Sequence, residues 1–454
     1  MRAAELGAAR VGIWGLGREG RAAIGFLRAH HPGLPLLLLD DAADAQPPDG
    51  CPGLECAFGA DAIAGALGRL EILVKSPGVS LYRPELATAR AHGVAITSLL
   101  NLWFAEDPAI TTIGVTGTKG KSTTASLIAH LLGRLGRRVA LAGNIGVPVT
   151  EIDPAVADFA VIEMSSYQAA DFRGCCDIAV LTSLYPEHID WHRTLAAYYR
   201  DKLNLLRHSR VAIVNCQAAA TIAEFGDVPL PRGELFNAAA GVHAEGREIF
   251  DGGWRIGEIG NRYLSRPHNL SNLCAALSVA KRLGLDLALA LDAAADFRAL
   301  PHRQQELGEI DGVLFVDDSI STAPESTLAA LEVYAGRDIA VIVGGYDRGI
   351  DYGKLVTALA AGAARAVVCL GNSGERICSG LETAAAGCAS HAVTACRARS
   401  MDEAVALARR LTAPGGVVLL SPAAPSYGYY RDFAERGRDF ARIAASAGNL
   451  QAAQ

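Results

Sequence analysis

A glycine-rich stretch, VTGTKGKSTT, has the residue types of a phosphate-binding loop. Gly117 and Gly120 permit a tight turn between an apolar strand and a helix, which points backbone N–H groups and the helix dipole at a phosphate chain. Lys121 is placed for the β- and γ-phosphates of a nucleotide, and the Ser122 hydroxyl is placed for Mg²⁺. The usual loop has a glycine where this chain has Val115, so we interpret the stretch as a shortened nucleotide-binding loop.

Polar residues downstream of the loop could complete a metal site. Glu163 closes the apolar run DFAVIEM, so its carboxylate should emerge at the sheet edge where the loop lies, within reach of a metal. His188 in YPEHIDWH and Lys202 in YYRDKLNL are weaker signals taken alone, because a lone histidine is more often structural and a helix lysine is more often solvated. The residues by themselves therefore predict one acidic ligand and leave two candidates open.

The N-terminal segment carries a second glycine pattern. In GLGREG, Gly15, Gly17 and Gly20 have the G-x-G-x-x-G spacing. Asp40 follows the last of these glycines by 20 residues, which is typical of NAD binding and alone would suggest a dehydrogenase. The same turn can hold any pyrophosphate, however, and the loop at Gly117 already supplies an energy source. We therefore favour another pyrophosphate over NAD.

Short apolar runs alternate with segments of helical periodicity along the chain, which is typical of βα units and parallel sheets. We therefore predict the α/β class. With 454 residues and about 150 residues per domain, three domains are expected, and we place them at 1–108, 109–299 and 300–454. Each is predicted to contain an open parallel sheet.

Composition excludes several classes of function. The net charge is −6 with acids and bases interspersed, so no basic stripe is expected to follow a nucleic-acid backbone. No apolar run approaches the roughly 18 residues that cross a bilayer, and we expect no export signal at the N-terminus. Ten cysteines without a CxxC pair indicate reduced thiols. We expect a cytoplasmic protein that binds neither nucleic acid nor membrane.

The shortened loop, T-G-T-x-G-K-S, resembles that of the Mur ligase family, the ATP-dependent enzymes that add amino acids to the muramoyl peptide of bacterial cell-wall precursors. VIEMSSYQ, YPEHIDWH, YYRDKLNL, HNLSNLCAAL and LPHRQQ resemble further motifs of the family, in the family's order and over almost the whole chain. The related folylpolyglutamate synthases share the loop but resemble this chain less elsewhere. The resemblance implies a Rossmann-like UDP-binding domain, a central P-loop ATPase-type domain and a C-terminal Rossmann-like α/β domain.

The resemblance further implies a site for ATP and two Mg²⁺ ions in the central domain. Ser122 and Glu163 would hold one ion. His188 and a carbamylated Lys202 would hold the other, because a lysine whose pKa is lowered by burial can react with CO₂ and become an anionic, carboxylate-like group. The implied catalytic residues are Lys121, His188, Lys202 and Arg303. The implied ATP-binding residues are Gly117, Thr118, Lys119, Gly120, Lys121, Ser122, Thr123, Asn269, Asn272, Arg303 and Asp318.

In the glutamate-adding branch of the family, the N-terminal domain binds the UDP of the substrate. The resemblance therefore favours UDP over NAD at the GLGREG turn. The implied UDP-substrate residues are Gly17, Arg18, Glu19, Asp40, Gly78, Asn144 and His188.

Three C-terminal segments, DDSISTAP, GGYDRGID and SPAAPSYGYYRDFAERG, resemble the family's amino-acid motifs but depart from them in places. Ile320 replaces a lysine, Ala323 an asparagine, and Arg348 a second lysine, which moves the donors to which a carboxylate docks. The combination resembles the branch that adds L-glutamate and leaves a separate epimerase to invert the new residue. Drift in an ordinary D-glutamate enzyme is the alternative. The implied glutamate-binding residues are Ser321, Thr322, Arg348, Ser426, Tyr427 and Phe433.

The implied reaction joins glutamate to UDP-N-acetylmuramoyl-L-alanine. The free carboxylate of that substrate would attack the γ-phosphate of ATP, and the glutamate amine would displace phosphate from the acyl phosphate. The third domain would close over this intermediate about the P-H-R junction. A nucleotide-dependent switch protein is the second interpretation, although it would need neither a carbamylated lysine nor an amino-acid site.

Overall fold

The computed structural model describes residues 1–48, 54–224, 233–386 and 393–446. The chain separates into two units, Met1–Phe297 and Arg298–Gln454. The expected boundary near residue 108 lies inside the first unit, so the three-domain division stays a prediction. Within the described ranges, no helix is long and apolar enough to cross a membrane.

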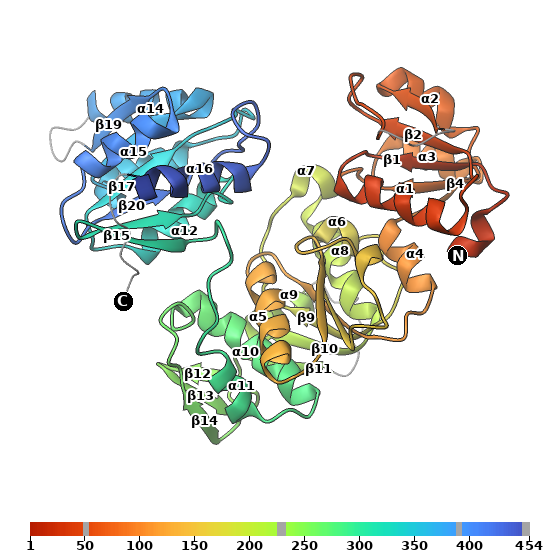
Figure 1. The fold of residues 1–454 in the computed structure, drawn as a ribbon, viewed down its shortest axis with the longest axis horizontal. Helices are drawn as coiled ribbons and strands as arrows, with labels where there is room; N and C mark the ends of the chain where they lie inside the picture. Colours follow the sequence, from red (N-terminus) through yellow and green to blue (C-terminus); the bar gives the residue numbers. More distant parts are fainter. Residues whose placement is uncertain (49–53, 225–232, 387–392, 447–454) are drawn as a thin grey trace. The chain divides into compact units, whose positions relative to one another are not determined.

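The N-terminal part of the first unit is a parallel sheet with strand order β3-β2-β1-β4-β5 (Figure 1). Its middle strands are apolar up to the terminal Asp40 of β2 and Lys75 of β4 and are largely buried, as expected for strands covered on both faces. Because parallel strands end at one edge, Trp14, Asp40 and Lys75 lie along the same edge, where the GLGREG turn begins. The elements are η1 (Ala3–Leu6), β1 (Val11–Trp14), α1 (Arg18–His30), β2 (Leu36–Asp40), β3 (Leu54–Phe58), α2 (Ala60–Leu67), β4 (Ile72–Lys75), α3 (Pro84–Ala91), β5 (Ala95–Thr97) and α4 (Leu99–Ala105).

The central part is a second parallel sheet, with strand order β11-β10-β9-β6-β8-β7. Val115 in β6 pairs with Glu163 in β8, so the loop and the acid leave the sheet at one edge, as predicted. The elements are β6 (Thr111–Thr116), α5 (Lys121–Arg134), β7 (Val139–Gly143), η2 (Val149–Glu151), β8 (Phe159–Glu163), α6 (Ser166–Ala169), β9 (Cys176–Leu181), α7 (Ile189–His192), α8 (Leu195–Arg207), β10 (Ser209–Asn215), α9 (Cys216–Glu224), β11 (Gly233–Phe236), α10 (Pro267–Arg282) and α11 (Leu287–Ala293).

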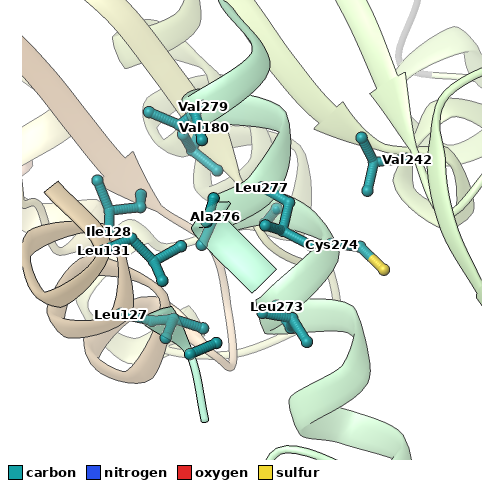
Figure 2. Close-up of a cluster of buried hydrophobic side chains, with 14 of the residues drawn as sticks. Leu127, Ile128, Leu131, Val180, Val242, Leu273, Cys274, Ala276, Leu277 and Val279 are labelled. Carbon is teal, nitrogen blue, oxygen red and sulfur yellow. The ribbon is translucent and has the colours of Figure 1, made fainter. Parts of the chain in front are cut away.

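The helix that follows the loop is fixed by an apolar core. Ile128 and Leu131 of α5 recur at helical spacing and lie in one buried cluster with Leu273 and Leu277 of α10 (Figure 2). Truncating one of these leucines to alanine would cost about 2–5 kcal/mol. The core therefore gives the loop a rigid base.

A small antiparallel sheet, with strand order β12-β13-β14, departs from the expectation of parallel strands only. Gly246 and Gly252 have φ of 60° and 57° in the tight turns between these strands. Such turns can join only antiparallel neighbours, because a parallel connection needs a long crossover. The strands are β12 (Val242–Glu245), β13 (Glu248–Asp251) and β14 (Trp254–Glu258).

The second unit has strand order β15-β16-β20-β17-β18-β19. Its prediction as a parallel sheet is wrong for β15, which pairs antiparallel to β16 through the turn at Asp311 and Gly312, both at positive φ. The elements are β15 (Gln305–Ile310), β16 (Val313–Asp317), α12 (Pro324–Val333), β17 (Ile339–Val343), α13 (Gly353–Ala358), η3 (Leu359–Ala363), β18 (Ala366–Leu370), α14 (Gly371–Ala386), β19 (Thr394–Ala398), α15 (Met401–Arg410), β20 (Val417–Leu420) and α16 (Phe433–Ser446).

Candidate active site

The turn after β6 can be made only by glycine. Gly117 and Gly120 have φ of 151° and 87°, which other residues rarely adopt. A Cβ on Gly117 would lie 2.0 Å from Oγ1 of Thr182, and one on Gly120 would lie 2.4 Å from Oδ1 of Asn272. The turn thus packs closely against the neighbouring chain, and α5 begins directly after it at Lys121.

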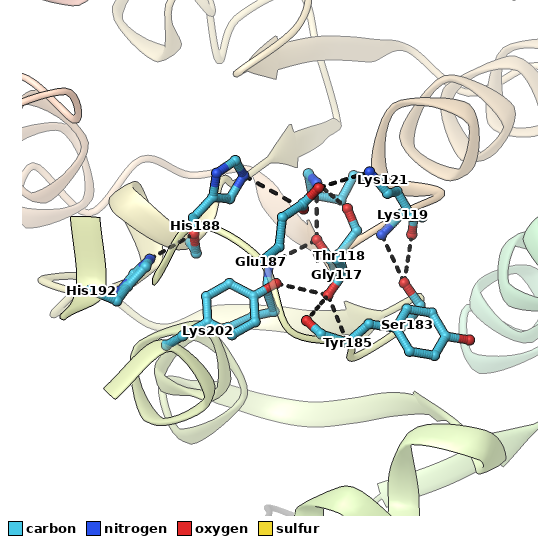
Figure 3. Close-up of polar contacts among 12 residues, drawn as sticks. Gly117, Thr118, Lys119, Lys121, Ser183, Tyr185, Glu187, His188, His192 and Lys202 are labelled. Atoms are coloured by element: carbon cyan, nitrogen blue, oxygen red, sulfur yellow. Dashed lines mark hydrogen bonds and ion pairs between the residues drawn. The ribbon is translucent and has the colours of Figure 1, made fainter. Parts of the chain in front are cut away.

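Two lysines meet at one backbone oxygen in this turn. The Lys121 ammonium donates to the carbonyl oxygens of Gly117 and Thr118, each at 2.9 Å. Lys202 of α8 donates to the same Gly117 oxygen at 2.8 Å (Figure 3). The structure therefore brings the predicted carbamylation site to the nucleotide loop.

Lys202 lies in an environment that disfavours its charge. The residue is 1% exposed. Burial, and secondarily the nearby charge of Lys121, holds the pKa of Lys202 well below its usual value. The neutral amine that carbamylation requires is thereby favoured.

Glu163 is fully buried at the end of β8. Its Oε1 accepts a hydrogen bond of 2.8 Å from the Asn144 amide, whereas its Oε2 is buried with no hydrogen-bond partner in the described ranges. An uncompensated buried carboxylate oxygen is costly, so this atom is a candidate to bind a cation. Asn144, predicted to bind the UDP substrate, thus contacts the predicted metal ligand.

His188 is the N-cap residue of α7 and has a left-handed conformation, with φ of 56°. Its Nε2 lies 3.5 Å from Oε2 of Glu187, and Glu187 Oε1 accepts from the Lys119 ammonium at 2.7 Å. Burial lowers the pKa of His188, which favours the neutral imidazole that binds metals. Burial acts to raise the pKa of Glu187, but the nearby Lys119 ammonium and other cations outweigh this effect, so the pKa is lowered. The sequence analysis did not name Glu187 as a site residue. Its position directly before His188 was the one sequence signal that pointed to it.

Asn269 and Asn272, at the start of α10, also lie at the loop. The Asn272 Oδ1 accepts from the Thr124 hydroxyl at 3.1 Å, and its amide donates to Asn269 Oδ1 at 3.1 Å. Ser122 and Thr123 are buried in the first turn of α5. The predicted nucleotide residues of the first unit therefore gather around one turn.

The structure contains no cluster of three His, Cys, Asp or Glu side chains placed to hold a metal, within the part of the chain it describes. The predicted set includes only two such residues, Glu163 and His188, beside Ser122 and Lys202. A carbamate on Lys202 would add the anionic oxygens that this set lacks.

The N-terminal glycine turn is tight. A Cβ on Gly20 would lie 1.9 Å from the Gly15 carbonyl oxygen. A Cβ on Gly17 or Gly78 would meet no atom within 4 Å. Asp40 accepts a hydrogen bond of 2.8 Å from the Leu16 backbone N–H, so this carboxylate buttresses the turn.

Arg18 and Glu19 join this turn to the central sheet. The Arg18 guanidinium donates to the carbonyl oxygens of Gly143 and Gly146, on either side of Asn144. Glu19 accepts from the amide of Gln168. The predicted UDP residues therefore extend from the N-terminal sheet to the loop after β7.

In the second unit, Asp318 follows β16 and is buried. It accepts hydrogen bonds from the hydroxyls of Ser321 at 2.6 Å and Ser421 at 2.8 Å, and from the Gln304 N–H at 3.1 Å. Burial nevertheless raises the pKa of Asp318 to about 6. The charge of Arg303 acts in the opposite direction, which places Arg303 near this carboxylate.

The predicted glutamate residues of the second unit differ in exposure, and Ser321 is buried. Arg348 is exposed and donates to the Thr322 carbonyl oxygen at 3.0 Å. Ser426 is buried, but Tyr427 is 60% exposed, and its ring lies 6.4 Å from that of Tyr346. The Phe433 carbonyl oxygen accepts from Ser319 at 2.7 Å.

Two family models match this chain: the Mur ligase middle domain over residues 115–280 and the Mur ligase glutamate ligase domain over residues 302–424. The UDP-N-acetylmuramoyl-L-alanine--L-glutamate ligase of Xanthomonas euvesicatoria pv. vesicatoria (strain 85-10) is 43% identical over 460 residues, which covers 98% of this chain and 97% of the relative. The chain belongs to the Mur ligase family and is a ligase.

Solved structures agree in fold. UDP-N-acetylmuramate-alanine ligase MurC from Thermotoga maritima has a TM-score of 0.57 at 19% identity, over 97% of this chain and 100% of that one. MurF ligase from Thermotoga maritima, solved in complex with ADP, has a TM-score of 0.56 at 16% identity, over 95% and 93%. The α/β architecture predicted from the sequence is confirmed.

Proposed function

We propose that this ligase joins L-glutamate to UDP-N-acetylmuramoyl-L-alanine at the expense of ATP, releasing ADP and phosphate. The 43% identical Xanthomonas relative is a UDP-N-acetylmuramoyl-L-alanine--L-glutamate ligase by name, which supports this substrate pair. The single observation that carries the chemistry is the meeting of Lys121 and buried Lys202 at the Gly117 carbonyl oxygen.

The residues present fit the proposed Mg²⁺ ions. The unsatisfied Oε2 of Glu163 can take a cation with the Ser122 hydroxyl, and His188 with a carbamylated Lys202 can take a second. When bound, these ions would neutralise the phosphate oxygens as two anions approach each other. The protein's own part is to hold Ser122, Glu163 and Lys202 in a buried, preorganised arrangement.

The proposed reaction proceeds in two steps. A carboxylate oxygen of the UDP substrate attacks the γ-phosphorus, and the bond to the ADP oxygen breaks. The amine of glutamate, having lost a proton, then attacks the acyl carbon, and phosphate leaves with the former carboxylate oxygen. We assign to Lys121 and Arg303 the stabilisation of charge on the transferred phosphoryl group, and the contact of the Lys121 ammonium with the Gly117 carbonyl oxygen of the loop supports the assignment of Lys121.

We assign the UDP moiety to the N-terminal glycine turn, with Gly17, Arg18, Gly78 and Asp40 around it. The open space at Gly17 and Gly78 leaves room for a pyrophosphate there. Arg18 contacts Gly143 and Gly146, on either side of Asn144, and the Asn144 amide donates to Glu163. A nucleotide bound at the N-terminal glycine turn would therefore lie near the end of β8 that carries Glu163.

The L-isomer is favoured by the altered amino-acid motifs, in which Ile320 and Arg348 replace lysines. An L-glutamyl product would require a separate epimerase, and both precursor and ATP place the reaction in the cytoplasm. The alternative is the same reaction with D-glutamate.

One assay tests the proposal. Purified protein is mixed with ATP, Mg²⁺, UDP-N-acetylmuramoyl-L-alanine and either L- or D-glutamate, and phosphate and the product mass are followed. Phosphate release that needs both substrates, with L-glutamate faster, supports the proposal. Release without either substrate would instead indicate a nucleotide switch, and faster reaction with D-glutamate would overturn the stereochemical part alone.

A further inference from the structure

His192 is a fully buried histidine with polar partners on both sides. Its Nδ1 lies 2.7 Å from Oδ2 of Asp201, and its Nε2 lies 2.9 Å from the Ser166 hydroxyl oxygen. An ionised carboxylate only accepts hydrogen bonds, so Nδ1 carries the proton. In the neutral ring, Nε2 then accepts from Ser166. The three side chains form one continuous hydrogen-bonded chain.

Each partner in this chain lies next to a different proposed metal ligand. Ser166 begins α6, three residues after Glu163. His192 ends the short α7, which follows His188 directly, as Figure 3 shows for the two histidines. Asp201 directly precedes the proposed carbamate residue in α8. The buried histidine therefore ties together α6, which follows Glu163, α7, which follows His188, and α8, which contains Lys202.

The hydrogen-bonded chain of side chains continues into the loop between β4 and α3. The Tyr82 hydroxyl donates to the same Asp201 Oδ2 at 2.8 Å and accepts from Arg200 at 3.1 Å. A second contact runs beside it, because the Ser80 hydroxyl donates to the Trp191 carbonyl oxygen at 2.7 Å. Ser80 and Tyr82 follow the turn at Gly78, which we assigned to the UDP substrate.

We propose that Tyr82, Asp201 and His192 are positioning residues, through which occupancy of the UDP turn orders α8 and its lysine for the reaction. This inference rests on the proposed function. A network that only stabilised the fold would need no path to the Gly78 turn. Here one carboxylate oxygen of Asp201 accepts both from Tyr82, in the loop between β4 and α3, and from His192 of α7, so a shift of either alters the other.

Hydrogen exchange tests the coupling without relying on catalysis. In the unaltered protein, adding UDP-N-acetylmuramoyl-L-alanine should slow amide exchange across residues 195–207. Tyr82→Phe and Asp201→Asn should each remove this slowing while the substrate still binds at saturation. Tyr334→Phe, which deletes a hydroxyl that lies 3.4 Å from Glu306 in the second unit, is the matched control and should retain the slowing.

Kinetics give the second readout. Each variant should lose about ten-fold in kcat, with KM for ATP within two-fold, and the double variant should lose no more than the worse single one. Equal slowing of exchange in all variants, no slowing in the unaltered protein, or kcat within two-fold of it would overturn the inference. If the unaltered protein ligates neither glutamate isomer, the proposed function fails, while the exchange measurement still decides the coupling.

Discussion

The nucleotide turn of the first unit and the amino-acid motifs of the second unit are built in opposite ways. Around the turn, Glu163 and Lys202 are buried and held by defined contacts. In the second unit, Tyr346 and Tyr427 are 47% and 60% exposed, and the exposed Arg348 donates to the Thr322 backbone oxygen. Glu163 and Lys202, proposed for phosphoryl transfer, are thus fixed before substrate arrives, whereas Arg348 and Tyr427, proposed for amino-acid selection, are open to it.

This difference follows from the chemistry each region is proposed to perform. Stabilising charge on a phosphoryl group requires donors that do not reorganise, and burial provides this. Selecting between isomers of one amino acid requires only that a few donors meet its carboxylates in the right places. We therefore expect substitutions at the turn to lower kcat strongly, and substitutions in the second unit to shift selectivity.

The largest effect is expected for Lys121→Met. Loss of the loop ammonium should reduce kcat for ligation by about a thousand-fold, because the loop loses the cation proposed to stabilise charge on the transferred phosphoryl group. Lys119→Met is the comparison variant. The Lys119 side chain is 56% exposed, so we expect kcat to fall by less than about ten-fold. Steady-state ADP release measures both, and equal losses would contradict the assigned roles.

Lys202→Ala should reduce kcat by about a hundred-fold, because the proposed carbamate is lost. Added formate or acetate should restore several-fold of the activity by supplying a carboxylate in the vacated space. Lys354→Ala, an exposed lysine on α13, should behave like the unaltered protein and gain nothing from the acids. No recovery in Lys202→Ala would argue against a carbamate.

Arg348→Lys should lower kcat/KM for L-glutamate by about ten-fold, because an ammonium cannot reproduce the planar fork of the guanidinium. Combining it with Ile320→Lys should move the preference towards D-glutamate. Arg397→Lys, on the same unit but paired with Glu375 and Glu382, is the control and should leave selectivity unchanged. Unchanged selectivity in the double variant would contradict the proposal that Ile320 and Arg348 set the preference for L-glutamate.

The smallest effect concerns Asp318, whose pKa is raised by burial from 3.8 to about 6. Between these values the folded state binds more protons than the unfolded state. Its stabilising contribution is therefore present below the unfolded pKa and is lost as pH rises through about 6. Asn does not titrate, so Asp318→Asn should gain roughly 1 kcal/mol relative to the parent between pH 5 and pH 7.5. Paired Tm measurements check this, and an equal Tm difference at both pH values would contradict it.

The sequence was informative where local patterns determine structure. The alternation of apolar strands and helices predicted the parallel sheets, and the run ending at Glu163 predicted the shared edge with the turn. The antiparallel strands β12 to β15 were missed, because they are short and mix polar with apolar residues, so no continuous apolar run marks them.

Contacts between distant residues were beyond reach. Nothing in the spacing of Tyr82 and Asp201, 119 residues apart, indicates a hydrogen bond between them. The burial of Lys202 against the Gly117 carbonyl likewise depends on how α8 packs, and no single-sequence pattern reports it. The family resemblance supplied that position, and the structure supplied its physical reason.

The central claim is that the carboxylate of the UDP substrate is activated by phosphoryl transfer at the shortened turn. The most direct test uses UDP-N-acetylmuramoyl-L-alanine with both carboxylate oxygens labelled with ¹⁸O, together with ATP, Mg²⁺ and L-glutamate, and mass analysis of the released phosphate. Our account predicts one ¹⁸O atom in each phosphate, because the leaving phosphate carries the former carboxylate oxygen. Phosphate free of ¹⁸O, released as the amide forms, would contradict it.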